Sequence, residues 1–279
     1  MAHPGMIYLG TSGFAFDDWK GPVYPDAVPR TQWLTFYERE LGFNALEVNY
    51  TYYQMPSART MEGMLRKVSP AFQFAVKTHR SLTHDVLQDG RVVDHPPAFE
   101  AFRRGLTPLT NAGQLGCVLA QFPYAFTNIE SHRTYLSAVA DRLGPLNLVV
   151  EFRHRSWVAP QTWAWLRERG VGACVVDEPA LSRLMPWVSE TTSDTGYVRF
   201  HGRNAAAWFG TSSAERYDYC YSEGELGELA ERTTAVAAHA KTTYVFFNNC
   251  HAGSAAKNAR QFRERLEAQG FLVTPSHES

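Results

Sequence analysis

The chain has 279 residues, of which 44% are hydrophobic and 20% are charged, and its formal net charge is −1. This composition is ordinary for a globular protein and excludes a disordered chain, a coiled coil and a small disulfide scaffold. The balanced charge argues against a non-specific nucleic-acid binder, which would carry a large positive excess.

The cysteines and the hydropathy of the chain indicate the cellular compartment in which the protein acts. The four cysteines form no CxxC pair and no zinc-type spacing. The first ten residues lack a signal-peptide pattern, and no apolar run approaches the roughly 18 residues of a membrane span. We therefore expect a cytoplasmic protein that has no membrane partner. No composition break divides the chain, so residues 1–279 are predicted to form a single domain.

Eight short apolar runs recur along the chain, and they are typical of strands buried on both faces. Amphipathic helical stripes separate most of these runs, so strand and helix alternate as in parallel βα units. The predicted strands are Met6–Gly10, Ala45–Asn49, Phe72–Lys77, Gly116–Gln121, Leu146–Glu151, Gly172–Asp177, Gly196–His201 and Thr243–Asn248.

Local signals mark where several helices begin. Ser57 is a candidate N-cap, Pro160 suits a first helical turn, and Ser222 with Glu225 forms a capping-box pattern. The helical stripes cover residues 34–41, 61–68, 99–109, 136–143, 163–166, 226–230 and 255–266.

Eight strands in 279 residues correspond to about 35 residues per unit, which predicts an α/β fold of the (β/α)8 TIM-barrel-like class. An open doubly wound sheet is the alternative. The sixth unit is predicted to be shortened, since Pro179 and Pro186 leave little room for a helix. The loop after strand 7, residues 203–221, is long and aromatic and serves either as a lid or as packing over the barrel.

Polar side chains occur at the C-terminal end of every predicted strand. In a parallel barrel these ends form one rim, which is where barrel enzymes place their catalytic groups. Because strand side chains alternate between faces, Glu47 and Asn49 share a face, as do Glu151 and Arg153. The pattern either forms a catalytic ring or consists of structural ion pairs such as Glu47–Lys77 and Glu151–Arg199.

Several short segments along the chain form a pattern that is specific in its order and spacing. They are Gly10–Gly13; Trp19, Gly21 and Tyr24–Pro25; Glu47–Asn49 with Tyr52–Tyr53 and Pro56; Phe74–Lys77 with Thr83–His84; Gln121–Pro123; Glu151–His154 with Ser156–Trp157; Asp177; Val198–Arg203; and Phe247–Asn249. Together these segments resemble the YecE-like family, catalogued as domain of unknown function 72, over about residues 7–266. The resemblance implies a TIM-barrel-like fold, similar to the endonuclease-IV and xylose-isomerase group, and supplies no reaction.

Our first hypothesis is an enzyme of hydrolase or lyase type that acts on an anionic or phosphorylated small molecule or nucleotide. Glu151 or Asp177 would be the general base, and Lys77 or His201 the general acid. The predicted catalytic residues are Glu47, Lys77, Glu151, Asp177 and His201. The predicted substrate-binding residues are Ser12, Asn49, Tyr53, His84, Gln121, Arg153, Trp157, Arg199, Asn248, Asn249 and Gly253.

Particular roles follow from residue type. Arg153, Arg199 and Arg203 could each fork onto a phosphate or carboxylate. Gly253 precedes the last helix, whose N-terminus could hold a phosphate. Lys77 could instead form a Schiff base, provided that a desolvated pocket lowers its pKa.

Two alternatives remain open. One is endonuclease-IV-like hydrolysis of phosphodiesters, in which the aromatic loop stacks bases. It would need a divalent metal, and no cofactor is otherwise expected; the candidate ligands His79, His84, His201, Glu47, Glu151 and Asp177 lack a recognised spacing. The other is a non-enzymatic barrel that binds a metabolite against an apolar wall of Trp19, Tyr53, Trp157 and Trp208.

Overall fold

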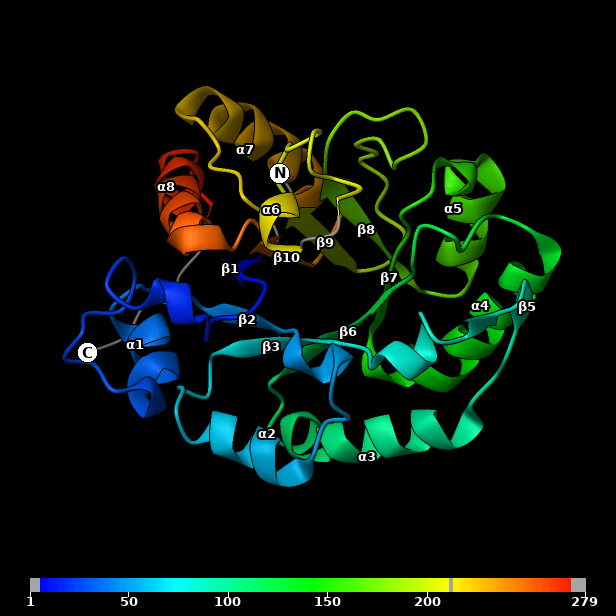
Figure 1. The fold of residues 1–279 in the computed structure, drawn as a ribbon, viewed down its shortest axis with the longest axis horizontal. Helices are drawn as coiled ribbons and strands as arrows, with labels where there is room; N and C mark the ends of the chain where they lie inside the picture. Colours follow the sequence, from blue (N-terminus) through cyan, green and yellow to red (C-terminus); the bar gives the residue numbers. More distant parts are fainter. Residues whose placement is uncertain (1–5, 211–212, 272–279) are drawn as a thin grey trace.

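Eight parallel strands form the centre of the computed structural model, which describes residues 6–210 and 213–271 (Figure 1). The strand order β1-β10-β9-β8-β7-β6-β3-β2 follows the chain around a nearly closed barrel, as the sequence predicts. The strands are β1 (Met6–Thr11), β2 (Ala45–Val48), β3 (Gln73–Lys77), β6 (Leu115–Gln121), β7 (Leu148–Glu151), β8 (Gly172–Asp177), β9 (Thr195–Phe200) and β10 (Thr242–Phe247).

The barrel closes between β1 and β2 through side chains as well as backbone. Ser12 pairs with Glu47 in a parallel bridge, and the Gly13 N–H donates to the Glu47 carbonyl at 2.9 Å. Nearer the N-terminal end of β2, the Tyr37 hydroxyl accepts from the Thr11 N–H at 2.7 Å and donates to the Ala45 carbonyl at 3.1 Å. Gly10 permits this approach, because a Cβ there would lie 2.0 Å from the Ala45 carbonyl oxygen.

Helices surround the strands (Figure 1), and several of them begin at the predicted signals. The Ser57 side chain accepts from the Thr60 N–H, Pro160 opens its helix, and Ser222 and Glu225 form a complete capping box. No helix among the described residues has the length and hydropathy to cross a membrane. The helices are α1 (Trp33–Arg39), α2 (Ala58–Leu65), α3 (Pro96–Asn111), α4 (Glu130–Leu143), α5 (Pro160–Glu168), α6 (Ser213–Arg216), α7 (Glu223–Ala237) and α8 (Ser254–Ala268).

Two units are irregular, as expected. The described residues between β8 and β9 form no helix, and those between β9 and α7 form only the short α6. A two-stranded hairpin, β4 (Leu87–Gln88) with β5 (Arg91–Val92), follows β3 and was not predicted. Its strands have two residues each, which is too short for a periodic pattern in the sequence.

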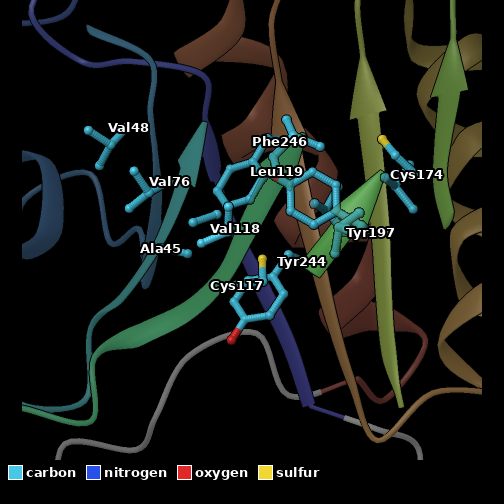
Figure 2. Packing of buried hydrophobic residues seen from close by; sticks show 14 of the residues in the cluster. Ala45, Val48, Val76, Cys117, Val118, Leu119, Cys174, Tyr197, Tyr244 and Phe246 are labelled. Atoms are coloured by element: carbon cyan, nitrogen blue, oxygen red, sulfur yellow. The ribbon is translucent and has the colours of Figure 1, made fainter. Parts of the chain in front are cut away.

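Aromatic and sulfur-containing side chains fill the barrel interior (Figure 2). The ring of Tyr197 lies 6.3 Å from that of Tyr244 and 5.4 Å from that of Phe246. Cys117 and Cys174 are buried beside them as free thiols. These side chains fill the interior of the barrel below the C-terminal ends of the strands, so a ligand can be accommodated only at the ends of the barrel.

Candidate functional site

The alternation of side chains along each strand decides which rim residues face the barrel axis. Tyr197 and Arg199 of β9 contact groups inside the barrel, whereas Phe200 packs against Phe262 of α8. Residues that share the inward face with Tyr197 and Arg199 therefore point into the mouth of the barrel, defined here as its C-terminal end. This set includes Ser12, Glu47, Lys77, Gln121, Glu151, Arg199, His201 and Asn248.

Arg199 lies at the centre of the mouth and is 1% exposed. Its Nη2 is 2.7 Å from Glu47 Oε1, and its Nη1 is 2.6 Å from Glu151 Oε2. The Tyr197 hydroxyl donates to the second oxygen of Glu47 at 2.6 Å. One guanidinium thus joins the carboxylates of two separate strands, β2 and β7. The predicted Glu151–Arg199 pair is present, but Glu47 pairs with Arg199 and not with Lys77.

Glu151 is completely buried and is surrounded by cationic and imidazole groups. Its Oε1 is 2.5 Å from Arg153 Nε and 3.3 Å from His201 Nε2. Burial alone would raise the pKa of this carboxyl, but Arg153 and Arg199 hold the pKa well below its usual range. Glu151 is therefore a carboxylate at neutral pH and a poor proton acceptor.

His201 is neutral and its tautomer is fixed by Asn248. Burial and the neighbouring Arg153 hold the pKa of His201 well below its usual range. The Asn248 amide nitrogen lies 2.9 Å from His201 Nδ1, so Nδ1 accepts and Nε2 carries the proton toward Glu151. His201 therefore lies against Glu151 as a neutral imidazole and cannot serve as a cationic acid in this arrangement.

Arg153 extends the network to a carboxylate that the sequence did not suggest. Its Nη1 lies 2.9 Å from Glu178 Oε2, and the Met185 N–H donates to the other oxygen of Glu178 at 3.1 Å. The chain Glu47–Arg199–Glu151–Arg153–Glu178 joins three carboxyl groups to two guanidinium groups, and burial raises the pKa of the Glu178 carboxyl to about 7. We call these five residues the ion-pair network; its charges are almost entirely used within the protein.

A cavity of about 870 Å3 opens above the ion-pair network. This size is within the usual range of small-molecule sites. Most of the predicted substrate-binding residues contribute to its wall, together with aromatic groups from several loops. The predicted residues among its lining are Ser12, Asn49, Tyr53, Lys77, His84, Gln121, Arg153, Arg199 and Asn248.

Lys77 ends β3 and projects into this cavity as a half-buried amine. Its Nζ lies 4.6 Å from the centre of the Tyr52 ring, and no carboxylate among the described residues pairs with it. Burial, followed by the repulsion of Arg199, lowers the pKa of Lys77 to about 7. Lys77 therefore exists as both amine and ammonium near neutral pH, which suits acid–base or nucleophilic chemistry.

Neutral hydrogen-bonding groups lie around Lys77. Burial, and then the charge of Lys77, lower the pKa of His84 to about 3, so its imidazole is uncharged. The Thr83 hydroxyl is 2.9 Å from His84 Nδ1. Asn49 Oδ1 is buried without a hydrogen-bond partner among the described residues. This part of the cavity offers polar atoms that the protein itself does not fully use.

The loop after β9 supplies a wall that sequence reasoning identified only as aromatic. Trp208, Phe209, Arg216 and Tyr217 all line the cavity. The Arg216 guanidinium carbon lies 5.9 Å from the centre of the Trp208 ring, and its buried Nε has no hydrogen-bond partner. Within the described residues Arg216 also lacks a carboxylate partner, so it is the second unpaired cation at the mouth, after Lys77.

Asp177 does not join the inward ring, contrary to the prediction. It is in register with Phe200 of β9 and, like Phe200, faces the outer side of the barrel. There it accepts from Arg203, with the shortest contact at 2.7 Å, and from the Tyr221 hydroxyl at 2.7 Å. Asp177 and Arg203 therefore anchor the loop after β9, and Glu178, one residue later, occupies the inward position.

Two predicted aromatic wall residues belong to the core. Trp157 is 2% exposed, stacks on Phe152 at 4.2 Å and donates its indole N–H to the Phe126 carbonyl. Trp19 is fully buried and donates to the Cys250 carbonyl at 2.7 Å. Both indoles have satisfied donors and no face toward the cavity. Tyr53 and Trp208 do line it.

The expected phosphate site at the last helix is also absent from the cavity wall. Gly253 is buried, and the nearest group to a Cβ there would be Val23 at 2.7 Å. The neighbouring Ala252 N–H already donates to the Asp18 carboxylate at 2.7 Å. Asn249 faces outward and donates to Asn258 of α8. These groups hold the strand-to-helix connection in place.

The described residues show no group of three His, Cys, Asp or Glu side chains arranged to hold a metal ion. Of the candidate ligands, Glu47 and Glu151 are engaged by Arg199, and Asp177 faces away from them. The donor set that the endonuclease-like alternative requires is therefore not assembled by these residues.

Comparison with known proteins gives matches over nearly the whole chain. A family model described as "Protein of unknown function DUF72" matches residues 8–279. The UPF0759 protein YunF of Bacillus subtilis (strain 168) is 30% identical over 97% of this chain and 98% of its own length.

Solved structures agree with this placement. A DUF72 family protein from Thermotoga maritima MSB8 is 46% identical, with a TM-score of 0.87 over 94% of this chain and 99% of that one. Another, from Enterococcus faecalis V583, is 26% identical, with a TM-score of 0.81 over 94% and 96% of the two chains.

Proposed function

This chain belongs to the family of proteins of unknown function DUF72, and we propose that the mouth of its barrel is an enzyme active site for a small anionic molecule. The observation that carries the proposal is the pair of cations, Lys77 and Arg216, that line the cavity without a carboxylate partner among the described residues. An anionic ligand would supply that partner.

The ion-pair network explains why the ligand's charge would be met by these two residues. Arg199 and Arg153 are paired with Glu47, Glu151 and Glu178, so little of their positive charge is free to attract a ligand. Of the two acidic lining residues, Asp17 pairs with Arg30, whereas Asp18 accepts from the Ala252 N–H and keeps its charge, so the lining presents two unpaired cations against one uncompensated carboxylate. A carboxylate or a phosphate ester is the ligand class that complements the remaining charge.

Catalysis is proposed to depend on Lys77. Its lowered pKa supports proton transfer near neutral pH. Asn49, Gln121 and neutral His84 would orient the polar groups of the ligand. In the same proposal the protein acts in the cytoplasm, a compartment consistent with four free cysteines.

Ligand binding tests the proposal without knowledge of the reaction. Inorganic phosphate and a panel of carboxylated and phosphorylated metabolites are titrated calorimetrically into the wild type and the Arg216→Gln variant. Arg260→Gln is the matched control, since Arg260 is exposed on α8 outside the cavity. We expect Arg216→Gln to weaken binding by about tenfold, the loss of one charge-assisted contact. Equal affinities in all three proteins would refute the anion site.

A nucleotide or a single nucleic-acid strand is a second candidate ligand, favoured by one observation. Tyr53 and Phe209 line the cavity and are 75% and 63% exposed, which is unusual for large aromatic side chains and suits base stacking. Fluorescence anisotropy with a labelled oligothymidine tests it. Loss of binding in Tyr53→Ala and Phe209→Ala would favour this candidate, and no binding by the wild type would exclude it.

A further inference from the structure

Lys77 differs from every other cation at the barrel mouth in residue type. Arginine accounts for 22 of the 27 basic residues of the chain, and the other basic groups that face the cavity are arginines and histidines. An arginine would bind an anion at least as well, through its planar fork, but it cannot act as a nucleophile. The lysine at the end of β3 therefore suggests that the amine itself reacts.

We propose that Lys77 forms a Schiff base with the carbonyl carbon of an anionic aldehyde or ketone, a class that includes 2-oxo acids and phosphorylated aldehydes. This inference rests on the proposed function, because it uses the same cavity and assigns the anionic group to Arg216. It adds the identity of the reacting atom and narrows the substrate to carbonyl compounds.

The surroundings of Lys77 meet the needs of this chemistry. The amine is half buried against the Tyr52 ring, and in the part of the chain that the structure describes no carboxylate pairs with it to hold it as an ammonium ion. The two glutamates of the ion-pair network whose charges act on Lys77, Glu47 and Glu151, are bound to Arg199 at 2.7 and 2.6 Å. A lysine placed beside a cation in a desolvated pocket is a recognised form of activated amine.

The reaction balances without a further reactant. The ammonium first loses a proton to water, and the amine lone pair then attacks the carbonyl carbon while the π electrons move to oxygen. The nitrogen of the adduct loses a proton, and the oxygen gains two protons in all and leaves as water when the C–O bond breaks. The product is a protonated imine, which carries the same single positive charge as the original ammonium.

The pocket would stabilise that product through charge. The imine cation lies in the same cavity as Arg153 and Arg199, whose charges are compensated within the network. The ligand's carboxylate would offset one of the two positive charges of the imine and Arg216, and a phosphate dianion would offset both. An uncharged aldehyde lacks this balance, so the site should discriminate strongly in favour of anionic carbonyl compounds.

Reductive trapping tests the inference with two matched probes. Wild-type protein is incubated at pH 7 with glyoxylate, an anionic aldehyde, or glycolaldehyde, an uncharged one, each with sodium cyanoborohydride. Peptide mass spectrometry then measures modification at each of the five lysines. We expect glyoxylate to modify Lys77 at least about tenfold faster than Lys257, since an ordinary lysine has only about four amines in ten thousand deprotonated at pH 7. Lys257 is exposed on α8.

Variants assign the effect to the site. Arg216→Gln should slow the modification of Lys77 by glyoxylate and leave the rate of its modification by glycolaldehyde unchanged. Arg260→Gln should change neither rate. Lys77→Arg keeps the positive charge, so it should abolish trapping at the cavity while inorganic phosphate still binds. If Lys77→Arg does not fold, Lys77→Met is used for the trapping experiment in its place.

Each outcome decides between the two proposals. If Lys77 is modified no faster than Lys257, the Schiff base is refuted. If phosphate binding still depends on Arg216 in that case, the proposed anion site is supported although the Schiff base is not. If phosphate binding is also absent, both proposals fail. Fast trapping by both aldehydes alike would support a reactive amine but overturn the requirement for an anionic carbonyl compound.

Discussion

Replacing Arg199 with methionine is the perturbation that tests the ion-pair network most severely. Methionine retains much of the side-chain length and removes the charge. Glu47 then keeps only the hydrogen bond from Tyr197, and Glu151 keeps Arg153 and His201. Because Arg199, Glu47 and Glu151 are at most 1% exposed, the orphaned carboxylate cannot recover its hydration from bulk water.

The expected cost follows from this burial. Removing one partner of a buried ion pair costs about 3–5 kcal/mol, because it leaves an uncompensated charge. Adding Glu47→Gln removes the orphaned charge, so the double variant should be more stable than Arg199→Met alone. We expect a coupling energy of about 3 kcal/mol between these two residues, the upper end for residues in direct contact.

Urea unfolding of the wild type, both single variants and the double variant measures these terms. Arg169→Met is the control, because its 2.6 Å contact with Asp141 is exposed to solvent and should be worth less than about 1 kcal/mol. A loss below about 1 kcal/mol in Arg199→Met with an unchanged denaturant slope would refute the reasoning, since the network would then contribute no more than a surface pair.

Three further substitutions test separate parts of the structure. Gly10→Ala should destabilise the protein by more than about 2 kcal/mol in urea, since its Cβ would lie 2.0 Å from the Ala45 carbonyl oxygen; wild-type stability would contradict the β1–β2 packing. Asp177→Asn should cost about 1–3 kcal/mol and speed limited proteolysis within residues 203–221, whereas exposed Asp141→Asn should change neither. Ser222→Ala should lower the free energy of unfolding by about 1 kcal/mol, because the helix loses its N-cap; a loss of less than about 0.3 kcal/mol would contradict the role of the capping box.

The barrel was predictable because strands buried on both faces are nearly continuous apolar runs. Gly172–Asp177, for example, is apolar up to its last residue and forms β8 with the predicted bounds. The predicted strand at Leu146–Glu151 begins two residues too early, because Gly144–Leu146 form a 3-10 turn and Asn147 adopts a left-handed conformation.

The same continuity explains the main error in the site. Along β8 both faces are buried, so alternation in the sequence gave no indication of which side Asp177 faces. The structure places Glu178 inward instead. Arg216 was missed for another reason: the loop after β9 has no periodic pattern, and only its packing against Trp208 brings that cation over the mouth.

Titration of Lys77 is the most direct test of the central claim, which is that an unpaired, reactive amine occupies an anion-binding cavity. With lysine labelled by carbon-13 at Cε, five signals are expected, and Lys77→Arg assigns the one of interest. We predict that this signal titrates near pH 7 and that inorganic phosphate moves its midpoint upward, because an anion favours the ammonium form. A midpoint near 10.4, the ordinary value for lysine, that phosphate leaves unchanged would contradict the account.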